Sequence, residues 1–192
     1  VRENPLMADT SIDLVSFVGL GAMGGPMCAN LAAKSPVPVV AYDINDEAVA
    51  SVVSAGAVRA NNLASVGDAD IVFVCVPGEA ETRSVCLGAG GICEHARPGQ
   101  IIVDCTTATV AINLEVAEVL RSKGAHFADA PVARGVPNAI DGTLSITVGA
   151  EDAIFSEIAP WLRHMGSDVA HCGPVGTGTV MKLMNNMVLF EN

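Results

Sequence analysis

The segment LVSFVGLGAMG, which begins at Leu14, constrains the fold more than any other part of this chain. In it an apolar run is followed by three glycines in GxGxxG spacing, Gly19, Gly21 and Gly24, and then by a stretch with helical patterning. Such a turn lets the backbone bend sharply at the first glycine, approach a diphosphate at the second, and pack helix against strand at the third. Amide groups at the start of the helix then point at the phosphates.

The alternative is an ordinary glycine-rich turn, which a lone GxGxxG would favour. The context argues against it, because the next apolar run ends in Asp43, at about the twenty-residue distance that a dinucleotide site requires. A carboxylate there accepts hydrogen bonds from the adenosine ribose and repels a 2′-phosphate, and no arginine stands at 44–46. We therefore predict NAD as the cofactor, with NADP less favoured. The predicted contacts of this region are Gly19, Leu20, Gly21, Ala22, Met23, Gly24 and Asp43.

Short apolar runs alternate with longer helix-patterned segments along most of the chain. We predict strands at 14–18, 37–42, 71–76, 101–104, 126–129 and 144–148. We predict helices at 22–34, 46–55, 79–87, 110–123 and 152–164. The predicted fold class is therefore α/β, a Rossmann-type doubly wound and mostly parallel sheet, with the start of a long helix at the C-terminus.

The same pattern divides the chain into three parts. Residues 1–13 are expected to be a flexible extension, and residues 14–174 to be the dinucleotide-binding domain. A turn-rich stretch at 171–179 leads into a helix at 180–192, which reaches the last residue without a stop signal. We therefore expect residues 175–192 to begin an interdomain helix, and the chain to be a fragment or to lack a partner domain.

Charge and composition exclude several classes of function. Acidic residues outnumber basic ones by 21 to 10, which disfavours nucleic-acid binding. No apolar run is long enough to span a membrane, so no membrane partner is expected. The six cysteines contain no CxxC pair, and two of them, Cys75 and Cys105, lie in or beside apolar runs, so we predict buried thiols in a reducing cytoplasm. The four histidines show no metal-ligand spacing, so no metal site is predicted.

Four separated segments resemble the β-hydroxyacid dehydrogenase family, which includes 3-hydroxyisobutyrate dehydrogenase and tartronate semialdehyde reductase. They are residues 19–24 with Asn30 and Leu31, residues 103–107, residues 129–135 with 141–144, and residues 173–178 with Lys182 and Asn186. The resemblance covers nearly the whole chain. It implies that the cofactor domain is followed by a long helix and an all-helical domain, which builds a homo-oligomer and completes the site.

Lys182 and Asn186 are spaced i,i+4, so a helix places both on one face, in an otherwise apolar run. The resemblance implies that hydride passes between substrate and nicotinamide while Lys182 exchanges the hydroxyl proton and Asn186 orients the substrate. The alternative is a lysine whose stem packs on the apolar surface while its charge reaches water. Gly173, Gly176 and Gly178 favour the catalytic role, because bare backbone before the helix lets ligands approach.

Further cofactor contacts are expected at the ends of two strands. Thr107 follows the strand at 101–104, at the edge where open α/β sheets bind ligands, so its hydroxyl can reach the nicotinamide ribose or carboxamide. Val76 and Pro77 close the strand at 71–76, and the resemblance places this turn near the adenosine. Gly178 is the last predicted cofactor contact. Thr109 is expected to be a helix cap instead.

The chain departs from the family after Val132. The family usually has Ser-Gly-Gly there to hold the substrate carboxylate, and this chain has Ala133, Arg134 and Gly135. Arg134 could replace the serine with a bidentate clamp for a carboxylate, sulfonate or phosphonate. A similar arginine occurs in the sulfolactaldehyde reductase branch. The alternative is a solvated surface arginine, with Gly135 as the backbone contact.

These observations favour an NAD-dependent dehydrogenase that acts on a small anionic β-hydroxy acid or its semialdehyde, similar to 3-hydroxyisobutyrate. A sulfolactaldehyde reductase-like activity is one alternative. A phosphogluconate dehydrogenase-like activity is less favoured, because the resemblance there requires Lys-x-x-His-Asn and Asn185 stands in place of the histidine. A non-catalytic dinucleotide-binding module, or an inactive truncated fragment, is the alternative from another class, and the presence of Lys182 argues against the module.

Overall fold

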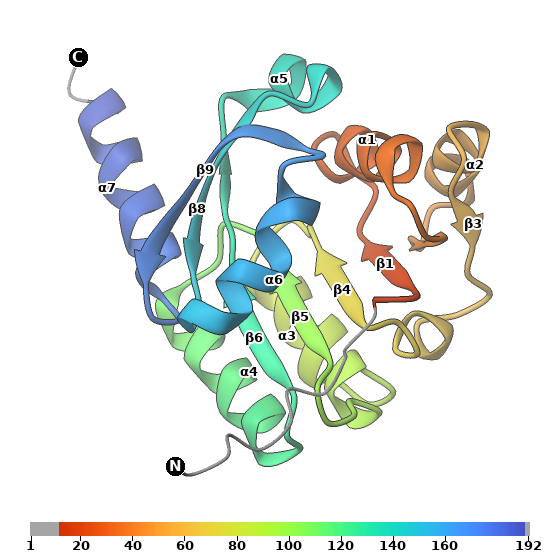
Figure 1. Cartoon of the computed structure of the whole chain (residues 1–192), viewed down its shortest axis with the longest axis horizontal. Coiled ribbons are helices and arrows are strands. Elements are labelled where there is room, and N and C mark those ends of the chain that lie inside the picture. The colour runs from red at the N-terminus through yellow and green to blue at the C-terminus, as the bar shows by residue number, and fades with distance from the viewer. Residues whose placement is uncertain (1–11, 191–192) are drawn as a thin grey trace, which may run out of the picture.

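The computed structural model describes residues 12–190 of the chain. The predicted flexible extension lies almost entirely outside the described residues, as do the last two residues of the predicted final helix. Figure 1 shows a central sheet with helices on both faces and one helix at its far end.

Nine strands form one sheet in the order β3-β2-β1-β4-β5-β6-β8-β7, with β9 also paired to β8. The strands are β1 (Val15–Val18), β2 (Val39–Tyr42), β3 (Val58–Arg59), β4 (Ile71–Val74), β5 (Ile101–Asp104), β6 (His126–Asp129), β7 (Val132–Ala133), β8 (Leu144–Gly149) and β9 (Gly166–Gly173). All pairs from β3 to β6 are parallel, whereas β8 runs antiparallel to β6 and β7. The strand order reverses between β1 and β4, so the carboxyl ends of these two strands are where a doubly wound sheet binds ligands.

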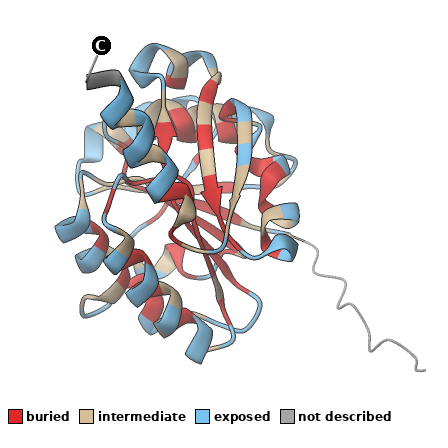
Figure 2. Cartoon of the chain, turned by 90° about the vertical axis from the view of Figure 1, so that its left-hand side faces the viewer, coloured by how far each residue is buried: buried red, intermediate tan, exposed pale blue. Residues whose placement is uncertain are grey.

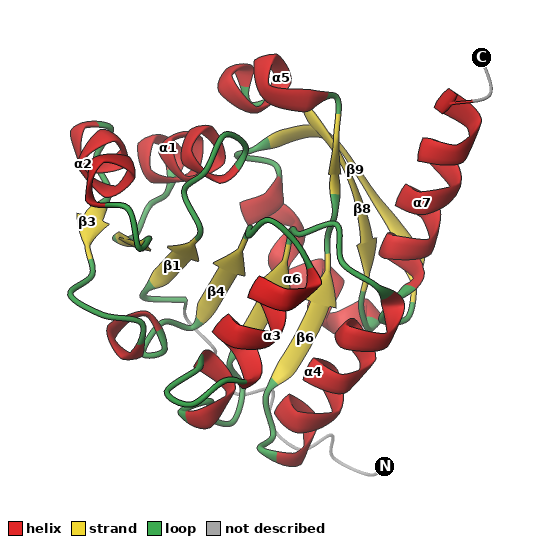
Figure 3. Ribbon diagram, turned by 180° about the vertical axis from the view of Figure 1, so that it is seen from behind, coloured by secondary structure: helices red, strands yellow, loops and turns green. Residues whose placement is uncertain are grey.

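The helices are α1 (Gly24–Lys34), α2 (Asp46–Ser54), α3 (Glu79–Leu87), α4 (Val110–Ser122), α5 (Gly135–Asp141), α6 (Asp152–Leu162) and α7 (Thr177–Phe190), with short 3-10 turns η1 (Ala64–Val66) and η2 (Ile92–Glu94). Helices α1, α2 and α6 pack on one face of the sheet, and α3 and α4 on the other (Figure 3). Strands β1, β4 and β5 are buried at every residue. The predicted α/β class and parallel core are therefore confirmed.

Two side chains cap helices as their residue types lead one to expect. Asn45 accepts a hydrogen bond from the N–H of Glu47 at 3.0 Å and so begins α2. Thr109 accepts one from the N–H of Ile112 at 3.4 Å and begins α4, as predicted. Both caps leave the strand-to-helix turns before them facing the same edge of the sheet.

The six predicted strands and five predicted helices are all present, and their ends match or are shifted by one or two residues. Helix α1 begins at Gly24 instead of residue 22, because residues 21–23 form the turn. Four elements were missed: the strands β3, β7 and β9 and the helix α5. The stretch predicted as turn-rich from 171 is wrong in its first part, because β9 continues to Gly173. The final helix begins at Thr177, three residues before its predicted start.

Helix α7 packs on β8, β9, β6 and α4 at its first turns. Its remaining turns extend away from the sheet, and much of their surface is exposed (Figure 2). Apolar side chains contribute heavily to that surface: Val180, Met181, Leu183, Met184, Met187 and Val188 are all exposed.

Candidate functional site

A cleft of about 1020 Å³ lies at the carboxyl ends of the parallel strands. Fourteen of the sequence-predicted site residues line it: Gly19, Gly21, Ala22, Met23, Gly24, Asp43, Val76, Pro77, Thr107, Ala133, Arg134, Gly135, Lys182 and Asn186. The glycine turn, the ends of three strands and the helix α7 thus meet at one site. Only Leu20 and Gly178 of the predicted set lie elsewhere.

The three glycines of the turn meet different surroundings. A Cβ added at Gly19 would collide with the carbonyl oxygen of Cys75, and φ is +90° there. A Cβ at Gly24 would collide with the carbonyl oxygen of Gly19, so these two glycines are required by the protein's own packing. A Cβ at Gly21 would meet no atom within 4 Å, although Gly21 lines the cleft. The surface next to Gly21 is therefore open for a ligand to contact bare backbone.

Asp43 lies directly after β2 and joins the glycine turn to α2. Its Oδ2 accepts a hydrogen bond from the N–H of Leu20 at 2.6 Å, and its Oδ1 accepts one from the N–H of Asn45 at 2.8 Å. The carboxylate is half-buried and still borders the cleft. It is thus held in one orientation, with room for further donors such as ribose hydroxyls.

The turns after β4 and β5 form the next wall of the cleft. The N–H of Val76 donates to the Oγ1 of Thr106 at 3.1 Å, which links the two turns. Thr107 is exposed and faces the cleft, while Thr106 is buried. Hydroxyls, backbone and small apolar groups therefore surround the space between the glycine turn and α7.

Lys182 and Asn186 lie on one face of α7 and border the same cleft. Partial burial lowers the pKa of the Lys182 ammonium below its ordinary value. A lysine with a lowered pKa at the open end of a ligand cleft can exchange a proton more readily than a solvated one.

Arg134 is the only described non-glycine residue with a positive φ, at 85°, and Gly135 follows it at 75°. Its guanidinium donates to the carbonyl oxygen of Thr143 at 2.9 Å and to the Oγ of Ser167 at 3.2 Å. It also forms an ion pair of 3.3 Å with Asp168 on β9. Thr143 and the β9 residues Ser167 and Asp168 thus hold the guanidinium at the rim of the cleft.

Gly178 does not line the cleft. It is buried against β8, and a Cβ there would lie 2.5 Å from the carbonyl oxygen of Thr147 and 2.7 Å from the N–H nitrogen of Gly149. The glycine allows the first turn of α7 to pack closely on the sheet. Its predicted role as a cofactor contact stays a prediction, and the contacts here show a packing role.

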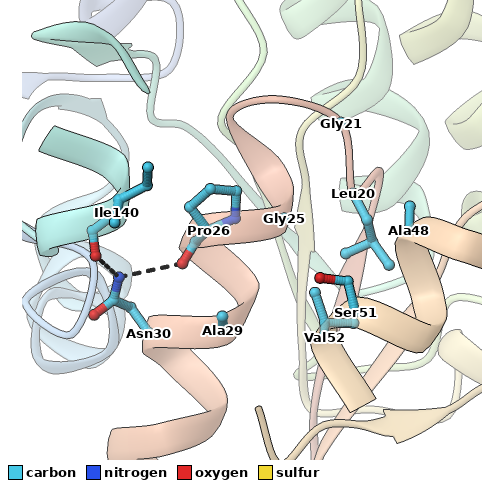
Figure 4. A pocket seen from close by; sticks show the side chains of 10 residues that line it. All are labelled: Leu20, Gly21, Gly25, Pro26, Ala29, Asn30, Ala48, Ser51, Val52 and Ile140. Carbon is cyan, nitrogen blue, oxygen red and sulfur yellow. Dashed lines mark hydrogen bonds between the residues drawn. The ribbon is translucent and has the colours of Figure 1, made fainter. Parts of the chain in front are cut away.

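A second, smaller cavity of about 340 Å³ lies between α1, α2 and α5, on the outer side of the glycine turn. Leu20 points into this space and not into the cleft (Figure 4). The Nδ2 of Asn30 donates to the carbonyl oxygens of Pro26, Ala139 and Ile140 at 2.9–3.2 Å, which ties α1 to α5. Leu20 can thus reach a ligand in the cleft only through its backbone.

Several cleft residues were missed from the sequence: Val18, Tyr42, Ile44, Asn45, Cys75, Glu81, Val85, Cys105, Thr106 and Val132. Cys75 lies near the end of the predicted strand at 71–76, and Cys105 and Thr106 follow the predicted strand at 101–104, so their position at the carboxyl edge could have identified them. The residues of α3 carry no such signal, because they reach the cleft from a helix face.

Within residues 12–190, no group of three or more His, Cys, Asp or Glu side chains is arranged to hold a metal ion. No helix in that part of the chain is long and apolar enough to cross a membrane. All six cysteines are free thiols, four of them buried.

The strand order, glycine turn and cleft define a Rossmann-type dinucleotide-binding domain. A family model described as the NAD binding domain of 6-phosphogluconate dehydrogenase matches residues 14–173, and the chain belongs to this family.

Curated relatives agree with this assignment. The 2-(hydroxymethyl)glutarate dehydrogenase of Eubacterium barkeri is 40% identical over 176 residues, which cover 91% of this chain and 58% of the relative. The mitochondrial 3-hydroxyisobutyrate dehydrogenase of Mus musculus is 36% identical, over 91% of this chain and 52% of the relative. The resemblance to β-hydroxyacid dehydrogenases is thus confirmed, and the chain spans between half and three fifths of the length of these relatives.

Solved structures give the same result. The 3-hydroxyisobutyrate dehydrogenase of Mycobacterium tuberculosis, solved with L-serine, matches with a TM-score of 0.85 at 31% identity, over 93% of this chain and 60% of that one. Psf3, solved with NADP+ and 2-OPP, matches with a TM-score of 0.85 at 27% identity, over 91% of this chain and 62% of that one.

Proposed function

We propose that this chain is the cofactor-binding part of an NAD-dependent dehydrogenase that interconverts a small anionic β-hydroxy acid and its semialdehyde. The observation that carries the proposal is the cleft itself, which brings the open backbone of Gly21, the carboxylate of Asp43 and the ammonium of Lys182 to one cavity. The named activities of the relatives support the substrate class.

The residues present fit a dinucleotide. Gly21 leaves room for a diphosphate next to the N-terminus of α1, where the positive end of the helix dipole favours an anion. Asp43 stands where the adenosine ribose would be bound, and its charge favours NAD over NADP. When bound, the nicotinamide accepts or supplies a hydride. Lys182 holds or releases the proton of the substrate hydroxyl, and Asn186, one turn further along α7, orients the substrate.

The substrate's anionic group is assigned to the rim formed by Ala133, Arg134 and Gly135. Gly135 offers an exposed backbone, and Arg134 brings positive charge to the same edge of the cleft. A carboxylate fits this rim, and a sulfonate is the second candidate because the guanidinium geometry suits either. With Arg134→Ala, the KM for the anionic substrate should rise with little change in kcat.

We also assign the boundary of the cofactor domain to residue 174 and the role of interdomain helix to residues 175–192. The apolar side chains of α7 are exposed, which supports a further part of the protein packing on them. We propose that this part is an all-helical domain, which also builds a homo-oligomer. A longer chain that extends α7 should bury these side chains. We place the protein in the cytoplasm, where six free thiols stay reduced.

The Gly21→Ala variant tests the cofactor site. The added methyl group meets no protein atom, so the fold should be retained, while NADH affinity falls at least tenfold because the ligand occupies that space. Gly67→Ala is the matched control, since it adds the same group to a turn outside the cleft and should leave the Kd unchanged. Equal NADH affinity in wild type and Gly21→Ala would reject the site.

The alternative is a dinucleotide-binding module without catalysis, which the short span relative to the curated enzymes keeps open. A panel of small hydroxy acids, including 3-hydroxyisobutyrate and 6-phosphogluconate, tested with NAD and NADP separates the two. Turnover that Lys182→Ala abolishes, with NADH affinity retained, supports the enzyme. NADH binding without any turnover supports the module.

A further inference from the structure

Two buried carboxylates lie side by side below the cleft, and neither belongs to the predicted site. Asp104 ends β5 and Asp129 ends β6, and the two are register partners on neighbouring parallel strands. Each is 1% exposed, and within residues 12–190 neither forms an ion pair. Buried unpaired charges are costly, so their hydrogen-bond partners indicate what they do.

Asp104 holds the cofactor side of the cleft. Its Oδ1 accepts the N–H of Thr106 at 2.8 Å, and its Oδ2 accepts the hydroxyl of Thr82 on α3 at 3.4 Å. Thr106 in turn accepts the N–H of Val76. One carboxylate therefore connects the turn after β4, the turn after β5 and the helix between them.

Asp129 holds the lysine side. Its Oδ1 accepts the N–H of Gly176 and its Oδ2 the N–H of Thr179, both at 2.6 Å. These are amide groups at the start of α7, which a helix cannot satisfy itself. A carboxylate there also matches the positive end of the helix dipole. Lys182 follows Thr179 by three residues, so Asp129 fixes the turn that carries it.

We propose that Asp104 and Asp129 are positioning residues, a carboxylate pair that fixes the cofactor side and the lysine side of the cleft relative to one another. The inference rests on the proposed function. The ionised carboxylates accept hydrogen bonds at both oxygens and so hold the three turns in one geometry, whereas protonation turns one of these acceptors into a donor.

The charges around the pair are few. Cys75, Cys86 and Cys105 surround Asp104, and Cys172 lies near Asp129. All four thiols have raised pKa values, so they stay neutral between pH 5 and pH 8. The charged residues of α3, Glu79, Glu81 and Arg83, are exposed. Burial raises the pKa of Asp104 to about 6 and also raises that of Asp129. Asp104 is therefore the group that titrates here near pH 6.

The test for Asp104 is the Kd for NADH between pH 5 and pH 8, measured by NADH fluorescence. For wild type we expect binding about tenfold weaker at pH 5 than at pH 7, as a pKa near 6 requires. Asp104→Asn should bind about tenfold more weakly at pH 7 and change less than twofold with pH. Thr106→Val, which keeps the carboxylate but removes the hydroxyl that holds Val76, should also weaken binding severalfold.

Asp70→Asn is the matched control. Asp70 also accepts two backbone N–H groups, from Asp13 and Leu14, but it lies at the opposite edge of the sheet. This variant should keep the wild-type pH profile even if it lowers the melting temperature. A wild-type profile in Asp104→Asn, or a flat profile in wild type, would overturn the role of Asp104. If wild type fails to bind NADH at pH 7, the proposed function fails first and the inference with it.

The positioning role of Asp129 is tested by measuring the pKa of Lys182. Reductive ¹³C-methylation allows the lysine pKa to be followed by NMR in the intact chain, and Lys182→Arg assigns its signal. Asp129→Asn should move the Lys182 pKa toward its ordinary value, because a loosened first turn lets the lysine reach water. Asp70→Asn should leave it unchanged. An unchanged Lys182 titration in Asp129→Asn would overturn the role of Asp129.

Discussion

The two parts of the sheet contribute to the cleft in different ways. The parallel strands β3 to β6 supply tight turns whose shape is imposed by buried neighbours and by glycines that cannot accept a Cβ. The second part, strands β7 to β9 together with helix α7, supplies side chains that are half-buried or exposed, such as Lys182 and Arg134. On the proposed function, cofactor binding would thus depend mainly on backbone geometry, and the chemistry on side chains of the second part. Substitutions in the two parts should therefore have different consequences.

The largest difference is expected in stability. Phe73 in β4 is fully buried and stacks with Phe17, so Phe73→Ala should lower the free energy of unfolding by about 3–5 kcal/mol. Met184 on α7 is 57% exposed, so Met184→Ala should change the free energy of unfolding by less than about 0.5 kcal/mol. Urea unfolding of both variants measures this. Similar losses would show that α7 is as much a part of the core as β4.

The next effect concerns pH and Asp104. Its pKa is raised to about 6 by burial, so between about pH 4 and pH 6 the folded chain binds more protons than the unfolded chain. Stability from this group is present below pH 4 and lost as the pH rises through 6, by roughly 3 kcal/mol at most. Relative to Asp104→Asn, wild type should thus become less stable over that window. If the free energies of unfolding of wild type and Asp104→Asn differ by a constant amount from pH 4 to pH 7, the raised pKa of Asp104 is contradicted.

A smaller effect separates two glycines of one turn. Gly24→Ala should cost about 1–3 kcal/mol, because the new methyl group collides with the carbonyl oxygen of Gly19. Gly21→Ala should cost less than about 0.5 kcal/mol and act on NADH binding instead. Comparing melting curves with and without NADH tells the two apart. Equal destabilisation by both would mean that Gly21 is also a packing position.

The smallest effect is expected at Arg134, whose φ is 85°. Both Arg134→Gly and Arg134→Ala remove the half-exposed ion pair with Asp168, which is worth at most about 1 kcal/mol. Glycine also relieves the left-handed conformation, so Arg134→Gly should be more stable than Arg134→Ala by about 1 kcal/mol. Chemical denaturation of the pair checks this. If alanine is as stable as glycine, the backbone here carries no strain.

The sequence sufficed to predict the parallel core, because each strand there is a short apolar run between glycine and helix signals. It did not reveal β3, which has two exposed residues, Val58 and Arg59, and is too short for any periodicity. Strand β9 contains polar residues such as Asp168, and only its last part, from His171, was predicted, as turn. Helix α5 begins at two left-handed residues, which sequence rules assign to loops.

The candidate site shows the same limit. Fourteen predicted residues meet at one cleft because motif positions follow strand ends, which topology brings together. Gly178 does not line the cleft, and a glycine required for packing looks the same in sequence as one required by a ligand. Asp104 and Asp129 were not identified as a pair, because strand register is not visible in a linear chain.

The amide of Asn30 has a mechanical consequence. It bonds the carbonyl oxygens of Pro26, Ala139 and Ile140, so the phosphate-side helix α1 and the short helix that follows Arg134 move as one body. On the proposed function, opening of the cleft would then move this body relative to α7, while the glycine turn and the loop at Arg134 keep their spacing.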